Sequence, residues 1–482
     1  MIEIHLRLCY DSHAMIGGEI MSYTDLKYLS TMLPEDILHA REYGDFDLAL
    51  DLIDRRIAGG MLPEALRKRL LLEKEILHLW PREYSITEEE AFEELKDGLG
   101  EFSKEEFDEL IREHYLDWAY VNGRRHIHED SIANLYKTRD DLARRAFERG
   151  KRSVPGGPSA LLDAAIAEMK ARGEVTTFFK VRSEITLKPD GSARHVRVWL
   201  PIPCEYAQVR NVHVTGCSHP DAHIDAPQAA QRTICMDGTD DRPFWVEYEY
   251  ETHMQYMNPD PQMVSGDQPG FCTEELEPHI RFTPYLRSLC GEIIGRETNP
   301  LLKARLIYEY VTHHVKYSYM RAYITMPMIP EHAAISQRGD CGVQALLFIT
   351  LCRIAGIPAR WQSGVYMEPG DVGCHDWAQF YVAPYGWMFC DCSFGGSAVR
   401  RGMKEREEFY FCNIDPFRMP ANSEFQHDFE IPPKHLRFDP YDNQLGEAEY
   451  EDRPVRRGWR STHHTLLTIS GLDCCKERPE YK

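Results

Sequence analysis

Hydrophobic and polar positions follow a helical period through the first 150 or so residues of the chain. Apolar side chains recur at helical spacing in Asp45–Ile57 and again in a leucine-rich run that begins at Leu70. Two segments, Ser85–Glu88 and Ser103–Glu106, have the form of a capping box, in which serine and glutamate bond the free N–H groups at a helix start. The pattern therefore predicts a helical N-terminal domain.

From Val175 the period of the pattern changes to two, which is typical of strands with one buried face. Alternating runs at Phe179–Leu187 and His195–Leu200 flank Asp190-Gly191, a dipeptide that favours a hairpin turn. Three further candidate strands follow, at Val209–Val214, Thr233–Met236 and Phe244–Tyr250. These runs predict a small antiparallel β-domain.

The longest apolar run extends from Val343 to Ala355 and is stopped by Gly356 and Pro358. A helix that is apolar on nearly every side should be buried. With Asp340 as its N-cap, Cys341 would lie in the first turn, where unpaired N–H groups and the helix dipole favour a thiolate over a thiol. Cys341 is therefore a candidate nucleophile.

Downstream, the sequence predicts two strands joined by a tight turn, at Cys374–Val382 and Trp387–Cys392. In this antiparallel hairpin His375 could lie across from Asp391, whose carboxylate would fix the imidazole tautomer. Asp376 is the alternative orienting residue, but neighbouring side chains of a strand point to opposite faces. We therefore assign the orienting role to Asp391.

The segments GDCGVQALLFITLCRIAGIPAR, HDWAQFYV and GWMFCDCS together resemble the conserved blocks of the transglutaminase-like superfamily. The resemblance implies a papain-like α+β core in which Cys341 is the nucleophile, His375 the general base and acid, and Asp391 the orienting carboxylate. The residue after the nucleophile is Gly342, where animal protein-crosslinking enzymes of the family carry Trp. This departure favours hydrolysis over crosslinking.

Other residues near these segments have less specific assignments. The backbone N–H of Cys341 is the natural first oxyanion donor, and Gln337 or Tyr317 could supply a second, although both could be ordinary loop or core residues. Trp377 could wall the cleft or fill the core. A zinc site built from Cys374, His375, Cys390 and Cys392 is disfavoured, because strand alternation sends these side chains to different faces. We expect neither a metal nor a cofactor.

Composition limits the classes of partner. A net charge of −21 argues against nucleic acid or an anionic membrane as the main partner, because both require a cationic surface. The N-terminal residues MIEIHLRLCYDSH do not have the pattern of a signal peptide. Fourteen cysteines are scattered without a disulfide framework, which is typical of reduced thiols and a cytoplasmic location.

The sequence thus predicts an α+β protein of four parts. These are an acidic helical domain (1–152), a linker helix with an antiparallel β-domain (153–270), a transglutaminase-like core (271–428) and a C-terminal extension (429–482). Within the core, Met320–Gln337 has no clear period and is expected to be a loop beside the substrate. The helical domain could bind a protein partner.

The activity that these features predict is a cysteine-dependent amide hydrolase acting on a peptide or protein amide through a thioester. Two alternatives stay open. One is a transamidase, in which an amine replaces water as the acceptor. The other is a binding scaffold that has lost turnover.

Overall fold

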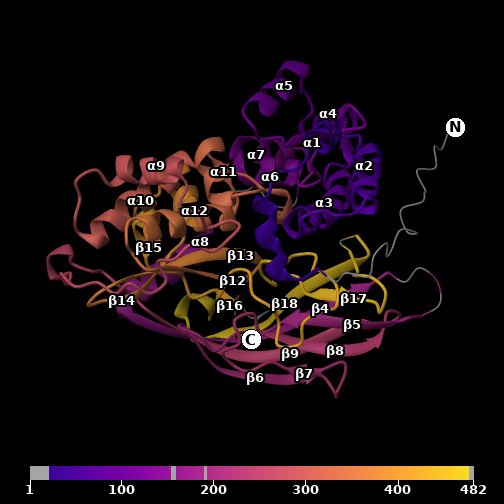
Figure 1. The fold of residues 1–482 in the computed structure, drawn as a ribbon. Coiled ribbons are helices and arrows are strands. Elements are labelled where there is room, and N and C mark those ends of the chain that lie inside the picture. Colours follow the sequence, from indigo (N-terminus) through magenta and orange to yellow (C-terminus); the bar gives the residue numbers. More distant parts are fainter. Residues whose placement is uncertain (1–20, 153–158, 189–190, 192, 457, 477–482) are drawn as a thin grey trace.

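The computed structural model describes residues 21–152, 159–188, 191, 193–456 and 458–476. The expectation about a signal peptide concerns residues that lie outside these ranges. Figure 1 shows the N-terminal helices and the helices of the core on one side of the molecule, with the long strands of the β-domain on the other. Among the described residues, none of the helices combines the length and apolar character that spanning a bilayer requires.

The N-terminal domain is helical, as predicted, and it also contains a small sheet. Its helices are η1 (Tyr23–Ser30), α1 (Glu35–Tyr43), α2 (Phe46–Ala58), α3 (Glu64–Glu83), α4 (Glu88–Leu99), α5 (Lys104–Arg112), α6 (Ser131–Thr138) and α7 (Asp140–Glu148). Its strands are β1 (Ile86–Thr87), β2 (Trp118–Val121) and β3 (Arg124–Ile127), in the order β1-β3-β2. Strands of two to four residues are too short to give a readable alternation.

One of the two predicted capping boxes is present. Ser103 and Glu106 form the box at the start of α5. At the start of α4 the box is formed by Thr87 and Glu90, two residues later than the Ser85–Glu88 prediction. The shift follows from β1, which occupies the residues between Ser85 and the helix.

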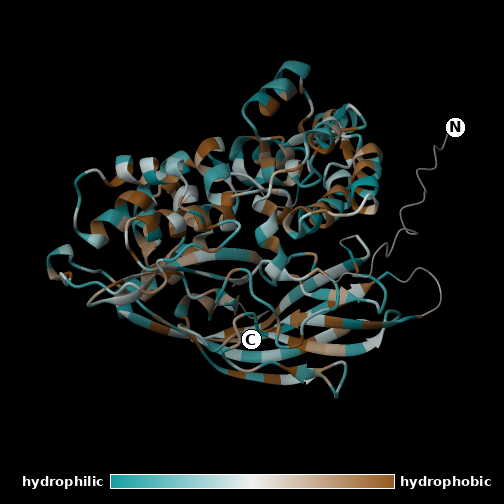
Figure 2. Ribbon diagram, in the orientation of Figure 1, coloured by the Kyte–Doolittle hydropathy of each residue, from teal (hydrophilic) through white to brown (hydrophobic). Residues whose placement is uncertain are grey.

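The β-domain is a sandwich of two sheets, preceded by α8 (Ala160–Arg172). Its strands are β4 (Glu174–Leu187), β5 (His195–Pro201), β6 (Val209–Cys217), β7 (His223–Ile224), β8 (Thr233–Thr239) and β9 (Phe244–Gln255). The hairpin predicted around Asp190-Gly191 is wrong, because β4 pairs with β9 and β5 pairs with β8 in the other sheet. Figure 2 shows alternating hydrophilic and hydrophobic bands along these strands, as expected where each sheet buries one face.

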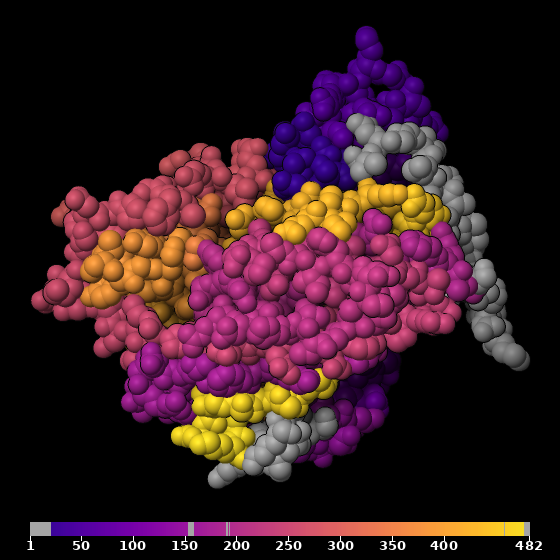
Figure 3. Space-filling view, turned by 90° about the horizontal axis from the view of Figure 1, so that it is seen from below, coloured from indigo at the N-terminus to yellow at the C-terminus, as the bar shows by residue number. Residues whose placement is uncertain are grey.

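The C-terminal residues complete both sheets of the sandwich. Strand β17 (Glu447–Glu449) pairs with β5, and β18 (Arg460–Ser470) pairs with β4 along most of its length. In Figure 3, C-terminal residues border the β-domain surface on opposite sides. The strands of the predicted C-terminal extension (429–482) thus supply edges that the two sheets would otherwise leave open.

The core places one buried helix against a five-stranded sheet with the order β15-β14-β13-β12-β16. Its helices are α9 (Pro284–Ile294), α10 (Pro300–His314), η3 (Tyr323–Thr325), α11 (Ile329–Ser336), α12 (Cys341–Ile354), α13 (Cys392–Arg400) and α14 (Lys404–Phe409). Its strands are β10 (Lys316–Tyr317), β11 (Arg338–Gly339), β12 (Ala359–Glu368), β13 (Asp371–Val382), β14 (Gly386–Cys390), β15 (Phe411–Cys412) and β16 (Arg418–Asn422).

Helix α12 has the character that its apolar run predicts. Every residue from Gly342 to Cys352 is buried. The helix ends as expected, with Gly356 at a φ of 77° and a hydrogen bond from Ile357 N–H to the carbonyl of Cys352. The predicted hairpin is also present, since β13 pairs antiparallel with β14.

The segment Met320–Gln337 is not the irregular loop that the sequence predicts. It contains η3 and the two-turn helix α11, in which Ala333 and Ala334 are buried. Pro330 lies at the start of α11, where its missing N–H has no helical partner to lose. The prolines therefore mark a helix start and not an unstructured strip.

Candidate active site

Cys341 is the first residue of α12 and its side chain is partly exposed. Asp340 caps the helix, with Oδ1 accepting hydrogen bonds from Val343 N–H (3.0 Å) and from the Tyr323 hydroxyl (2.6 Å). Burial raises the pKa of Asp340 to about 6. The chain thus places the thiol where the sequence predicts it, at the start of a buried and capped helix.

His375 and Asp391 are joined by a hydrogen bond of 2.8 Å between Nε2 and Oδ2. Asp391 follows β14 and is the N-cap of α13, where its Oδ1 accepts from the N–H groups of Ser393 and Phe394. Arg418 on β16 lies 2.9 Å from the same carboxylate, and both side chains are fully buried. The expected pairing of His375 with Asp391 is therefore present, held from a helix cap and not from a strand position.

The charge on Asp391 is set by its surroundings. Burial acts to raise the pKa of Asp391, but His375 and Arg418 outweigh it and lower the pKa to about 2. Burial also lowers the pKa of His375, so the neutral imidazole is favoured. At neutral pH the cation facing Asp391 is therefore Arg418, and the ionised carboxylate fixes which imidazole nitrogen carries the proton.

The sulfur of Cys341 donates a hydrogen bond to Asp376 Oδ2 over 3.3 Å. Burial and the carboxylates of Asp376 and Asp340 raise the pKa of Cys341 well above its usual value. The two carboxylates therefore act against the thiolate that the helix start is expected to favour. Burial also raises the pKa of Asp376 to about 8, with Asp340 adding to the effect, while Gln444 donates to the other carboxylate oxygen.

Cys341 and His375 have separate hydrogen-bond partners within the described part of the chain. The interaction with Asp391 uses Nε2 of His375 and leaves Nδ1 available. Both side chains lie within the electrostatic influence of Lys137, which lowers the pKa of each. Helix α12 packs against β13, so the thiol and the imidazole come from adjacent elements.

Gly342 lies in a space that admits no side chain. A Cβ built at this position would be 2.7 Å from Asp376 Oδ2 and 2.9 Å from the ring of Trp361, and closer still to the Tyr323 hydroxyl. Any side chain at the position after the nucleophile would therefore require Tyr323, Asp376 or Trp361 to move. No bulky side chain fits there without rearrangement.

The remaining predicted residues occupy three different environments. Trp377 is fully buried and donates from Nε1 to Gln362 Oε1 (2.6 Å), so it is a core residue beside His375. Tyr317 is partly exposed, and the Lys137 ammonium lies 5.0 Å from the centre of its ring. Gln337 is exposed and caps the end of α11, and its backbone carbonyl accepts from Lys316. The second oxyanion donor stays a prediction for Tyr317 and Gln337.

The four side chains considered for a zinc site, those of Cys374, His375, Cys390 and Cys392, have different environments. The sulfurs of Cys390 and Cys392 are buried and 3.8 Å apart, whereas Cys374 is exposed. His375 uses Nε2 to bond Asp391. The strand hairpin thus directs His375 into the proposed catalytic arrangement with Asp391.

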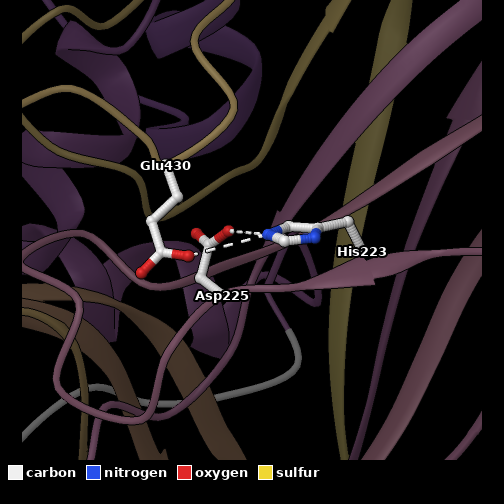
Figure 4. Close-up of side chains that lie close together, drawn as sticks. All are labelled: His223, Asp225 and Glu430. Carbon is white, nitrogen blue, oxygen red and sulfur yellow. Dashed lines mark ion pairs between the residues drawn. The ribbon is translucent and has the colours of Figure 1, made fainter.

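A second cluster of ionisable side chains lies on the β-domain. His223 Nε2 is 3.5 Å from Asp225 Oδ1 and 3.6 Å from Glu430 Oε2, and Figure 4 shows both carboxylates facing the imidazole. The three donor atoms lie within 4.8 Å of one another, so they could hold a divalent cation. The contacts of His223 with both carboxylates also link the β-domain to the segment that carries Glu430.

Sequence reasoning missed Arg418, Gln444 and Lys137 as neighbours of the site. Arg418 and Gln444 come from segments that follow the hairpin and carry no local pattern. Lys137 comes from the N-terminal domain, and nothing in the sequence distinguishes it from the other lysines and arginines, which number 56 in all. Asp376 is a candidate in the sequence because it is adjacent to His375. Its contact with Cys341 could not be predicted, because that contact depends on how α12 packs on β13.

A model of the transglutaminase-like superfamily matches residues 287–392. An uncharacterized protein of Haemophilus influenzae is 24% identical over 253 residues, which cover 42% of this chain and 65% of that protein. A solved structure from Cytophaga hutchinsonii, provisionally described as a cysteine protease, has 14% identity and a TM-score of 0.31, covering 62% of this chain and 91% of its own. The periplasmic domain of TgpA from Pseudomonas aeruginosa has 12% identity and a TM-score of 0.27, and the match covers 52% of this chain and 99% of that domain.

The segment matched by the family model contains Cys341, His375 and Asp391 together with the helix and hairpin that carry them. The mixed α+β core agrees with the fold that the resemblance implies. The part of this chain that is similar to the transglutaminase-like superfamily is therefore residues 287–392.

Proposed function

We propose that this protein is a cysteine-dependent amide hydrolase that acts on peptide or protein amides through Cys341, His375 and Asp391. The observation that carries the proposal is the ionised Asp391, held by Arg418 and by the N-terminus of α13 and bonded to His375 Nε2. A buried carboxylate in this position orients an imidazole for proton transfer and stabilises its protonated form. The superfamily match over these residues supports the same reading.

In the proposed reaction the thiol of Cys341 transfers its proton to His375 Nδ1, and the sulfur attacks the carbonyl carbon of the amide. His375 then returns the proton to the leaving amine as the C–N bond breaks, which leaves a thioester. Water, deprotonated by His375, then attacks the thioester carbonyl. The C–S bond breaks, a carboxylic acid is released, and His375 returns the proton to the sulfur of Cys341. Because the resting thiol faces Asp376, a rotation about the Cα–Cβ bond of Cys341 must turn the sulfur toward the imidazole.

The acceptor decides between hydrolysis and transamidation. An amine in place of water would give transamidation from the same thioester. Gly342 supports hydrolysis, because the family's animal crosslinking enzymes carry a Trp there, and Tyr323, Asp376 and Trp361 leave no room for one.

The location that we propose is the cytoplasm. In the described part of the chain, Cys204, Cys352 and Cys412 are buried thiols that form no disulfide. Cys390 and Cys392 support this reading, since their sulfurs are 3.8 Å apart and have not formed a bond of about 2 Å.

The test uses full-length protein and three variants, Cys341→Ala, His375→Asn and, as a control, Cys374→Ala. Each is incubated with a tryptic peptide mixture, with and without a labelled primary amine, and products are read by mass spectrometry. Cleaved or deamidated peptides in the wild type and Cys374→Ala, but not in the other two variants, are expected. Peptides that carry the labelled amine, in place of cleaved or deamidated peptides, would indicate transamidation. Identical spectra for wild type and Cys341→Ala would overturn the enzyme proposal and favour a scaffold.

A further inference from the structure

The N-terminal domain is fixed to the segments on both sides of the catalytic helix. Asn134 Oδ1 accepts from Tyr319 N–H (3.1 Å), and Glu83 Oε1 accepts from Ala322 N–H (2.7 Å). Arg338, three residues before Cys341, pairs with Asp117 at 3.0 Å. Further bonds join Arg401 at the end of α13 to Asp140 at 2.9 Å. These bonds hold helix α6 in a defined position relative to the thiol.

Helix α6 carries an exposed lysine, Lys137, at this junction. Its ammonium lies 5.0 and 5.2 Å from the ring centres of Tyr317 and Tyr319 and 3.4 Å from the Tyr317 hydroxyl. Tyr317 ends β10, which pairs with β11 immediately before Asp340 and Cys341, and Tyr319 lies two residues after Tyr317. The charge of Lys137 acts on Cys341, His375 and Asp340, whose pKa values it lowers.

Among the described residues of its domain, Lys137 has no carboxylate partner, and of the other lysines there Lys27 shares this property. Five that do pair with carboxylates are Lys68, Lys74, Lys96, Lys104 and Lys151. The contrast is informative in a chain with a net charge of −21, where a carboxylate partner is seldom far away. The half-buried carboxylate of Asp340 beside the thiol would otherwise repel an anionic substrate.

We propose that Lys137 forms an anion subsite of the active site, which selects substrates carrying a carboxylate close to the scissile amide. The carboxylate would be an acidic side chain or a free C-terminus, and it would pair with the ammonium in front of Tyr317 and Tyr319. The N-terminal domain is then a part of the substrate site. This inference rests on the proposed function of Cys341, whose substrate class it narrows.

The test compares two alkylating reagents that differ in charge, iodoacetate and iodoacetamide. Rates of modification at Cys341 are measured by mass spectrometry of the full-length protein at low salt and neutral pH. The ratio of the two rates reports preference for an anion, because any change in the thiol pKa affects both reagents alike and cancels. Exposed Cys374 is the internal reference in every sample.

Lys137→Met should lower the iodoacetate-to-iodoacetamide ratio at Cys341 by about tenfold, whereas Lys137→Arg should preserve it. The control Lys96→Met, on an exposed site of the same domain, should leave the ratio unchanged, as should Cys374 in all samples. An unchanged ratio in Lys137→Met, with folding verified by circular dichroism, would overturn the proposal. The ratio is readable even if no peptide is cleaved, so failure of the subsite and failure of the hydrolase proposal are distinguishable.

Discussion

Cys341 donates its thiol hydrogen bond to Asp376, the residue next to His375, and not to the imidazole itself. The structure therefore describes a resting arrangement in which a buried carboxylate opposes formation of the thiolate. Asp376 is held in turn by Gln444, whose side chain also donates to the backbone carbonyl of His375. The nucleophile and the base are thus linked through the backbone of one strand and a residue far along the chain.

Replacing Asp376 with Asn should lower the pKa of Cys341 and speed its alkylation by iodoacetamide. The thiolate fraction grows about tenfold for each unit by which the pKa falls. The pKa of Asp376 is about 8, so the difference from wild type should grow above that pH, where the wild-type carboxylate is charged. Rates at Cys341 across a pH series measure this, and Asp267→Asn on an exposed loop is the control. Equal rates above pH 8 would show that Asp376 does not restrain the thiol.

Replacing Gly342 with Ala should destabilise the protein by about 1–3 kcal/mol, because the added methyl group meets Tyr323, Asp376 and Trp361. Urea denaturation measures the free energy of unfolding. Gly373→Ala is the matched control, since a Cβ there meets no atom within 4 Å, and it should change stability by less than about 0.5 kcal/mol. Similar stabilities for the two variants would contradict the steric argument.

Replacing Arg418 with Met should be among the most damaging single changes in the core. The guanidinium lies 2.9 Å from Asp391 and 2.5 Å from Asp415, and all three side chains are fully buried. Its loss leaves two buried carboxylates without a counter-charge, at a cost of about 3–5 kcal/mol. Urea denaturation gives this value, and Arg55→Met, which breaks an exposed pair with Asp51, should cost less than about 1 kcal/mol. A similar decrease in the free energy of unfolding for both variants would contradict the role of Arg418 as the counter-charge of Asp391 and Asp415.

Acid should destabilise the protein through His279, which is buried beneath Tyr441 and Phe425. Burial lowers its pKa to about 3, so the unfolded chain binds a proton below pH 6.5 that the folded chain does not bind until near pH 3. The stability from the neutral imidazole is therefore complete above pH 6.5 and is lost as the pH falls toward 3.

His279→Phe removes this titration while keeping an aromatic ring in place. The loss of stability between pH 7 and pH 5 should be smaller in the variant by about 2 kcal/mol, measured by urea denaturation at each pH. His39→Phe on an exposed helix face should leave the pH dependence unchanged. Parallel curves for wild type and His279→Phe would exclude the histidine as the source of acid sensitivity.

The parts of the site that were predictable are those encoded by local patterns. The apolar run, the Asp340 cap and the Gly356 stop define α12 within a few residues, and alternation around a turn defines the β13–β14 hairpin. The pairing of His375 with Asp391 follows from these elements.

The arrangements that could not be predicted depend on contacts between distant segments. Nothing near Arg418 in the sequence indicates that it will neutralise Asp391. The alternating runs in β4 and β5 predict strands correctly but do not indicate which partners they take, so the predicted pairing of β4 with β5 is wrong. The contact between Asp376 and Cys341 could not be predicted for the same reason, because it arises only through tertiary packing.

The pairing of β18 with β4 has a consequence for synthesis. Ser183 and His464, which hydrogen-bond across this pair, are 281 residues apart, so translation of the whole catalytic core separates the two strands. A nascent chain must therefore carry β4 with an unpaired edge while the core emerges from the ribosome, and such edges promote aggregation. We infer that folding of the β-domain finishes only after release of β18, which makes early termination of translation more harmful to this protein than its small C-terminal strand suggests.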